Sequence, residues 1–250
     1  MKCNGDRVSY SIKAIAHFLT MITIKTPTHP FELSPESTAL LVIDMQNDFC
    51  HPDGFNGSEL NLDLTSVRAI IPAIQNLLTW SRQMGFEIIF TRESHAPDLS
   101  DLSDSKRQRY INAGSPIGQL GKMGRFLVRG EKGAEIISEL QPLSHESQLD
   151  KPAHSCFVNT ELDDKLRSHN ITHLLIAGVT TQCCVLATYR HASDLGYYCL
   201  LLDDCCAAFD RRDHDATVHI LQSEGGVLGW VAQSSTLYHA LYPCPNSPPD

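Results

Sequence analysis

The chain has 250 residues, of which 42% are hydrophobic, so it can bury one substantial core without being divided into several domains. Its 29 acidic and 20 basic residues give a formal charge of -9, and this balance, without any basic cluster, argues against nucleic acid as a partner. No stretch is long and apolar enough to cross a membrane, which argues against a membrane partner as well.

The cysteines and the two ends of the chain bear on its location. The chain contains nine cysteines, an odd number, and neither their spacing nor the chain length fits a small disulfide scaffold, so a reducing, cytoplasmic setting is expected. The mildly apolar segment Ala14–Ile24 is interrupted by polar residues and lacks a clear small-residue cleavage site, which disfavours a signal peptide. Residues 1–25 are therefore expected to form a loose extension, and the Pro-rich residues 243–250 a disordered tail.

The first elements alternate between strand and helix. Thr38–Asp44 (TALLVID) has the composition of a buried strand and ends in an acid. Thr65–Met84 has helical periodicity, and Pro72 is tolerable there only near the first turn or at a kink. Gly85 is expected to end this helix, and Phe86–Thr91 to form the next strand.

The middle of the chain is less regular. Residues 93–130 form a polar, Gly-containing stretch with short helical possibilities, and a loop of this length in a compact domain is more often functional than idle. After it, Gly133–Leu140 is expected to be a short helix and Ser147–Leu149 a short strand leading to Lys151. Glu161–Ser168 has the pattern of an amphipathic helix.

Alternation resumes in the last third. Leu174–Ala177 has the length of a buried parallel strand, and a turn at 178–181 leads into a segment with helical spacing. Further strands are expected at Tyr198–Asp203 and Val227–Val231, and helices at Asp213–Ser223 and Ser234–Leu241. Because strands and helices alternate without internal repeats, the prediction is one domain over residues 26–242, a three-layer α/β/α sandwich with a mainly parallel sheet.

Three polar residues fall where such a sheet exposes its ligand-binding edge. Cys183 and Cys184 stand at the start of the predicted helix after Ala177, where the helix dipole and unpaired N–H groups favour a thiolate and can hold an oxyanion. Asp44 and Lys151 follow other strands, and ligands bind at the carboxyl ends of parallel strands. An acid, a cation and a thiol at this edge would make a coherent nucleophilic site.

The pattern alone does not establish that site. A single aspartate after a strand is more often a turn or cap residue, and a single buried cysteine is more often an apolar filler.

Three blocks of sequence carry a resemblance to a known family. ALLVIDMQNDF, KPAHSCFVNTEL and AGVTTQCCVLATYRHASDLGY resemble the signature blocks of the isochorismatase-like cysteine hydrolases, and the similarity runs from about Phe31 to Leu241. The resemblance implies the isochorismatase-like fold, a homo-oligomer (dimer or tetramer), and a catalytic triad of Asp44, Lys151 and Cys184.

The resemblance also implies how the site is built. Cys183 fills a position that varies in the family and is assigned to packing. A cis peptide bond is expected before Thr180, and the backbone N–H groups of Thr180 and Cys184 would form the oxyanion hole.

Further segments bear on the substrate. TRESHAPDLSDL, GRFLVRGEKG, LLLDDCCAA and EGGVLGW look closest to the biuret and triuret hydrolase branch, with ureidoacrylate amidohydrolases more distant. Phe49, Arg92 and Glu224 are candidate substrate contacts, although Arg92 and Arg125 fit a surface or interface role better. Glu224 stands where biuret hydrolases carry Gln, and an ionised carboxylate only accepts hydrogen bonds, which puts biuret itself in doubt while leaving ureido-type amides possible.

Metal and cofactor are not expected. Nicotinamidases of the family bind a divalent ion through an Asp-x-His motif and a further His, whereas this chain has Glu93-Ser94-His95 and no clear second ligand. Nicotinamide is accordingly disfavoured as a substrate.

The reaction expected from this resemblance is hydrolysis of a C–N bond in a small linear ureido-type amide, through a thioester on Cys184 and with release of ammonia. Alternatives are another activity of the family (ureidoacrylate or nicotinamide amidohydrolase, or isochorismatase) or a non-catalytic binding protein on the same fold. True isochorismatases cleave a vinyl ether without needing the cysteine, so the presence of Cys184 argues against that chemistry.

Overall fold

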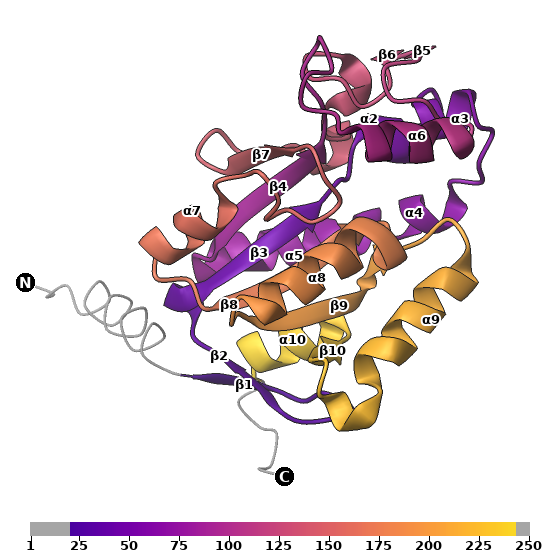
Figure 1. The fold of residues 1–250 in the computed structure, drawn as a ribbon. Helices are drawn as coiled ribbons and strands as arrows, with labels where there is room; N and C mark the ends of the chain where they lie inside the picture. Colours follow the sequence, from indigo (N-terminus) through magenta and orange to yellow (C-terminus); the bar gives the residue numbers. More distant parts are fainter. Residues whose placement is uncertain (1–20, 244–250) are drawn as a thin grey trace, which may run out of the picture.

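The computed structural model describes residues 21–243 and shows a three-layer α/β/α architecture (Figure 1). Its centre is a six-stranded parallel sheet with the order β10-β9-β8-β3-β4-β7. The strands are β3 (Thr38–Ile43), β4 (Glu87–Glu93), β7 (Ser147–Lys151), β8 (His173–Val179), β9 (Tyr198–Ala207) and β10 (Trp230–Ala232). The central strands β3 and β8 are buried at every position because both faces are covered, so the predicted fold class is confirmed.

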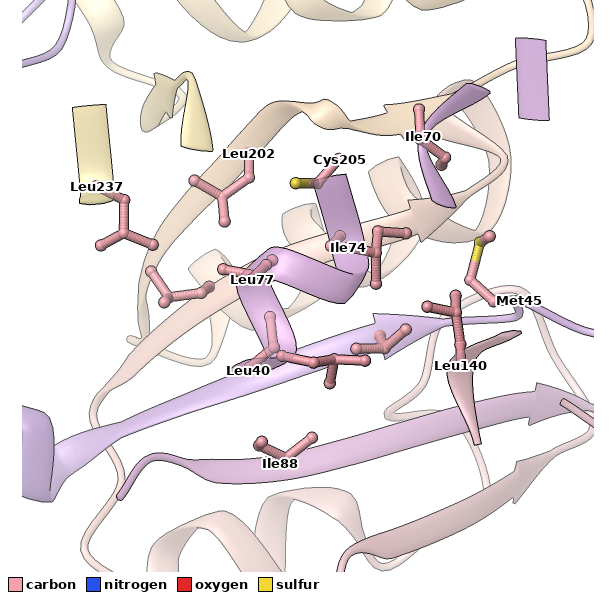
Figure 2. Close-up of a cluster of buried hydrophobic side chains, with 14 of the residues drawn as sticks. Leu40, Met45, Ile70, Ile74, Leu77, Ile88, Leu140, Leu202, Cys205 and Leu237 are labelled. Atoms are coloured by element: carbon pink, nitrogen blue, oxygen red, sulfur yellow. The ribbon is translucent and has the colours of Figure 1, made fainter. Parts of the chain in front are cut away.

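Helices cover both faces of this sheet. One face carries α4 (Thr65–Ala69), α5 (Ile71–Met84) and α10 (Ser234–Leu241), and the other α7 (Leu162–Ser168), α8 (Leu186–Asp194) and α9 (Arg211–Gln222) (Figure 1). Neighbouring residues of β3 point to opposite faces, so Leu40 belongs to one buried cluster and Leu41 to the other. Figure 2 shows the first cluster, in which Leu40 and Ile88 of the sheet lie with Ile74 and Leu77 of α5.

The segment predicted as one helix over Thr65–Met84 is two helices that meet at Ile70. Pro72 lies in the first turn of α5, where its missing N–H leaves no hydrogen bond unmade, as predicted. Gly85 caps the end of α5 in the left-handed conformation with φ 73°, and β4 begins two residues later.

The segment between β4 and β7 contains more structure than its sequence indicated. It includes α6 (Asp104–Asn112), whose first turn is capped by the Ser103 hydroxyl, and a small hairpin of β5 (Leu120–Gly121) and β6 (Gly124–Arg125). The helix predicted at Gly133–Leu140 is wrong. Two short 3-10 turns, η2 (Lys132–Ala134) and η3 (Ser138–Leu140), flank extended residues there, because Ile136 and Ile137 are drawn into the core.

The remaining elements lie at the edges of the domain. They are β1 (Ile22–Ile24), β2 (Phe31–Leu33), η1 (Pro35–Ser37), α2 (Asn47–Cys50), α3 (Phe55–Ser58) and η5 (Glu224–Gly226). β1 pairs with β2 and Ile24 is fully buried, so the packed domain begins before residue 26. The expectations for residues 1–20 and 244–250 lie outside the described residues. Within 21–243, no helix combines the length and apolar character that a membrane crossing needs.

Candidate active site

Four polar side chains meet at the carboxyl ends of four neighbouring strands. Asp44 follows β3, Glu93 is the last residue of β4, Lys151 is the last residue of β7, and Cys184 lies in the turn after β8. These strands are adjacent in the order β8-β3-β4-β7, and all four side chains are buried. The structure thus brings together the three residues of the predicted triad and adds Glu93 to them.

Asp44 and Lys151 form a buried ion pair. Oδ2 of Asp44 lies 2.8 Å from Nζ of Lys151, while Oδ1 accepts a hydrogen bond of 2.7 Å from the hydroxyl of Thr91. Lys151 also donates to the carbonyl oxygen of Ala153 at 2.9 Å. Burial alone would favour the neutral amine, but Asp44, Cys184 and Glu93 together outweigh this effect and hold the pKa of Lys151 well above its ordinary value. Lys151 is therefore an ammonium group with fixed geometry beside the Asp44 carboxylate.

The turn after β8 places Cys184 beside this pair. β8 ends at a cis peptide bond between Val179 and Thr180, which the sequence resemblance implied, and Thr181–Val185 then form one π-helical turn (η4) before α8. Gly178 has φ 118°, and a Cβ there would lie 2.0 Å from the carbonyl oxygen of Ile43. Only glycine allows β8 to approach β3 this closely at the site.

The surroundings of Cys184 raise the pKa of its thiol, whereas the sequence favoured its thiolate. Its Sγ donates to Oε2 of Glu93 at 3.3 Å. The hydrogen bond with Cys183, burial and the nearby carboxylates raise the pKa of Cys184 well above the ordinary value, and Lys151 only partly offsets them. A π-helical turn rather than an α-helical N-terminus surrounds the thiol, so Cys184 needs a base to become a nucleophile.

Glu93 is held by side chains that were not predicted from the sequence to lie at the site. Its Oε1 lies 2.5 Å from Nζ of Lys106 and accepts a 2.8 Å hydrogen bond from the Tyr110 hydroxyl. Its Oε2 faces Cys184 and lies 3.9 Å from Nζ of Lys151. Burial alone would raise the pKa of Glu93, but the two ammonium groups hold it well below its ordinary range. Glu93 is therefore an ionised acceptor.

Lys106 is held by further partners. Its Nζ lies 3.0 Å from Nε2 of His95 and donates to the carbonyl oxygen of Pro152 at 2.8 Å. Nδ1 of His95 lies 3.1 Å from Asp101. Burial and the Lys106 charge lower the pKa of His95, so its imidazole is neutral, accepts from Lys106 at Nε2 and donates to Asp101 at Nδ1.

A sequence signal for Glu93 existed, because it ends the strand after Asp44 in the same sheet. The predicted strand stopped at Thr91, two residues early, and Glu93 was considered only as part of a metal motif. No comparable signal existed for Lys106, whose helix α6 is polar and has no clear apolar face in the sequence.

Cys183, assigned to packing from the sequence, also lines the site. It is half-buried and lies next to His154, whose ring contacts the Tyr110 hydroxyl at 3.3 Å. The hydrogen bond with Cys184 and the contact with His154 lower the pKa of Cys183 to about 5. The hydrogen bond with Cys183 in turn raises the pKa of His154. The two adjacent thiols thus differ, and Cys183 is the more acidic.

A cavity of about 110 Å³ opens onto these groups. It is lined by Phe49, Glu93, Tyr110, Val179, Thr180, Cys183, Cys184 and Phe209. Phe49, predicted as a substrate contact, forms part of its wall together with two other aromatic rings. Thr180 and Cys184 also line it, as an oxyanion hole made by their backbone N–H groups requires.

Comparison with known proteins identifies the family behind this geometry. The model of the isochorismatase domain matches residues 38–233, which include all four polar residues. The chain belongs to the isochorismatase family. The resemblance inferred from the three sequence blocks is confirmed.

Two proteins similar to this isochorismatase-family chain have more specific names. A ureidoacrylate amidohydrolase of Acinetobacter baylyi is 29% identical over 222 residues, which cover 87% of this chain and 89% of the relative. The crystal structure of a cysteine hydrolase from Pseudomonas syringae pv. phaseolicola superposes with a TM-score of 0.72 at 26% identity, over 87% of this chain and 98% of that one.

A third relative is more distant. The structure of a nicotinamidase from Bacillus subtilis has a TM-score of 0.61 at 25% identity, over 79% of this chain and 99% of that one.

Two of the predicted substrate contacts lie away from the cavity of this family member. The Arg92 guanidinium forms a two-fold ion pair with Asp150 on the neighbouring strand, at 2.8 and 3.1 Å, and does not line the cavity. Glu224 lies in an exposed turn before β10, at the amino ends of the parallel strands. It is therefore at the opposite edge of the sheet from Cys184, and this placement corrects the expectation that it contacts the substrate.

One group of side chains has the composition of a metal site. Ligand atoms of Asp44, Glu93 and Cys184 lie within 4.8 Å of one another. However, the ammonium group of Lys151 lies beside both carboxylates, and that of Lys106 lies on Glu93. A divalent cation would meet two positive charges already in place, so this donor set fits charge balance by lysines better than a metal ion.

Proposed function

We propose that this protein is a cysteine amidohydrolase that cleaves the C–N bond of a small linear ureido-type amide and releases ammonia. The observation that carries the proposal is the position of the Cys184 thiol, which lines a small cavity and is backed by the Asp44–Lys151 ion pair. A nucleophile, a base and a cation in mutual reach are what acyl transfer from an amide requires.

Asp44 is the base in this proposal. Its Oδ2 contacts the Lys151 ammonium but, among the described residues, has no well-aligned hydrogen-bond donor, which leaves a lone pair for a proton. Glu93 is the poorer base because two ammonium groups stabilise its ionised form. Asp44 therefore takes the proton from Cys184 as the sulfur attacks the carbonyl carbon.

The remaining steps follow from the same groups. The N–H groups of Thr180 and Cys184 hold the oxyanion of the tetrahedral intermediate. The intermediate collapses to a thioester when the C–N bond breaks, and Asp44 returns its proton to the departing ammonia. Water, deprotonated by Asp44, then cleaves the thioester to the acid, and the thiol recovers its proton. Lys151 stabilises the anionic states of Asp44 and Cys184 throughout.

Cavity size and shape support a small, flat substrate. A volume of about 110 Å³ admits only a small molecule. The rings of Phe49, Tyr110 and Phe209 line it, and flat amides pack well against such rings. The names of the relatives support an amide, and the loop segments noted in the sequence favour a biuret-like compound over ureidoacrylate. A cytoplasmic homo-oligomer, dimer or tetramer, is part of the same proposal.

Ammonia release tests the proposal directly. Biuret, triuret, a ureidoacrylate-like amide and nicotinamide are incubated with the wild-type protein and with Cys184→Ala, whose fold is checked by circular dichroism. Release from the ureido compounds that is lost in Cys184→Ala is the expected result. Turnover of nicotinamide alone would show that the substrate is not a ureido-type amide. Unchanged turnover in Cys184→Ala would overturn the assignment of the nucleophile.

A further inference from the structure

Glu93 lies beside the nucleophile but has no role in the proposed reaction. Its Oε1 is occupied by Lys106 and Tyr110, whereas its Oε2 faces the cavity and accepts only the Cys184 thiol at hydrogen-bond distance among the described residues. The backbone of Glu93 is fixed as well, because its N–H donates to Gln46 at 2.7 Å and its carbonyl oxygen accepts from the same side chain at 3.1 Å. The free oxygen is therefore held rigidly next to the nucleophile.

This oxygen loses its donor when the reaction starts. Once the proton of Cys184 has passed to Asp44, Oε2 of Glu93 is a buried carboxylate oxygen facing an anionic sulfur. A buried anionic acceptor without a donor is costly, so a bound substrate is favoured if it brings an N–H or O–H group to this point.

The three substituents of the attacked carbonyl carbon can be assigned to three sides of the site. Its oxygen lies toward the backbone N–H groups of Thr180 and Cys184. The departing nitrogen must lie toward Asp44, which supplies its proton. The third substituent is then directed toward Glu93, whose Oε2 accepts the hydrogen bond from the sulfur and whose side chain lines the cavity.

We propose that Glu93 is a substrate-recognition residue whose Oε2 accepts the N–H that a ureido group carries on the attacked carbonyl. This inference rests on the proposed function and narrows it. In a ureido amide this third substituent is an N–H, whereas in an ordinary carboxamide it is a CH₂, which cannot donate. The site selects the ureido class because only that class replaces the hydrogen bond that Cys184 gives up.

Lys106 and Tyr110 have a supporting role. They hold Oε1 in place, and the charges of Lys151 and Lys106 keep the carboxylate ionised, so the acceptor is ready before the substrate binds. A hydrogen bond to an ionised acceptor is stronger than one between neutral groups.

Two matched substrates test the inference. Biuret and malonamide both carry terminal amides and differ at the central position, where biuret has N–H and malonamide has CH₂. The wild-type protein and Glu93→Gln are compared by kcat/KM on both compounds, and circular dichroism confirms that the variant is folded. The intrinsic reactivity of each compound is the same with either protein. The biuret-to-malonamide ratio of kcat/KM in the wild type, divided by the same ratio in Glu93→Gln, therefore isolates the contribution of Glu93.

The expected result is selective. Glu93→Gln should lower kcat/KM for biuret by roughly 10- to 100-fold, the loss of a hydrogen bond to a charged group, and should affect malonamide several-fold less. An equal loss on both compounds would overturn the inference and leave the proposed function standing. No turnover of any ureido amide by the wild-type protein would overturn both.

A second variant guards against a folding defect. Glu93→Gln leaves the buried Lys106 without its partner, which can destabilise the fold by itself. The double variant Glu93→Gln/Lys106→Met removes both charges and keeps the side-chain volumes similar. It should show the same selective loss on biuret. A biuret-to-malonamide preference equal to that of the wild type in this variant would overturn the inference.

Discussion

The hydroxyl of Thr181 lies 2.9 Å from Nδ1 of His214, and this contact ties the turn that carries Cys184 to helix α9. Nε2 of the same imidazole lies 2.8 Å from Oδ1 of Asp203 in β9. Because Asp203 accepts the proton on Nε2, Nδ1 is left to accept the Thr181 hydroxyl. A chain of hydrogen bonds from half-buried Asp203 through buried His214 thus holds Thr181, the residue after Thr180. It thereby also holds the turn proposed to bind the oxyanion.

Thr181→Val should therefore impair the chemical step more than substrate binding. The variant has nearly the same shape but cannot donate to His214, so the oxyanion turn loses an anchor. We expect kcat to fall by roughly tenfold, less than the loss of a whole oxyanion donor, while KM changes little. Steady-state kinetics on the ammonia-releasing substrate measure both parameters.

Thr181→Ser is the matched control because it keeps the hydroxyl and loses only a methyl group. It should retain most of the wild-type kcat. Equal losses in the two variants would show that packing of the methyl group, not the hydrogen bond to His214, matters at this position.

The two adjacent cysteines should react differently with an alkylating agent. Cys183 has a pKa of about 5, and the pKa of Cys184 is raised, so near pH 7 the thiolate is mainly on Cys183. Brief treatment with iodoacetamide, followed by peptide mass spectrometry, should find Cys183 modified before Cys184. His154→Gln should slow this labelling because it removes the partner that stabilises the Cys183 thiolate.

Labelling of Cys184 first, with Cys183 untouched, would contradict this order. It would also restore the interpretation from the sequence that Cys184 is itself the activated thiol. Cys183→Ala is the control that separates the two sites, since the adjacent residues fall in one peptide.

Much of the candidate site could be predicted from strand ends. Asp44 and Cys184 come after apolar runs and Lys151 after a short predicted strand, and the rule that parallel strands present ligands at their carboxyl ends places them together. The same rule applies to Glu93, but its strand was predicted to end at Thr91, whereas pairing with β7 continues β4 through Arg92 to Glu93.

Other parts could not be predicted because they depend on contacts between distant segments. Lys106 is buried only because it meets Glu93 and His95, and nothing within the sequence of α6 distinguishes it from an exposed lysine. Glu224 looked like a site residue from its sequence context. The topology decides otherwise, because α9 returns the chain to the amino ends of the strands before β10.

Asp48 offers a test of stability as a function of pH. It lies in α2 next to Phe49 of the cavity wall, is buried, and accepts a 2.9 Å hydrogen bond from the backbone N–H of Leu127. Burial raises its pKa from 3.8 to about 6, against the effect of hydrogen bonds from Leu127 and Phe55.

The sign of the effect follows from this shift. The folded protein binds the Asp48 proton more tightly than the unfolded chain, so stability from this group is complete below pH 3.8 and is lost as the pH rises to about 6. The loss should be about 3 kcal/mol, since one pKa unit corresponds to about 1.4 kcal/mol. Asp48→Asn cannot ionise, so between pH 3 and 7 its free energy of unfolding should rise by this amount relative to that of the wild type. Urea unfolding of both proteins at several pH values measures the difference.

If the difference in the free energy of unfolding between the two proteins stays constant over this range, Asp48 titrates normally in the folded protein, and its burial is offset by the two backbone donors.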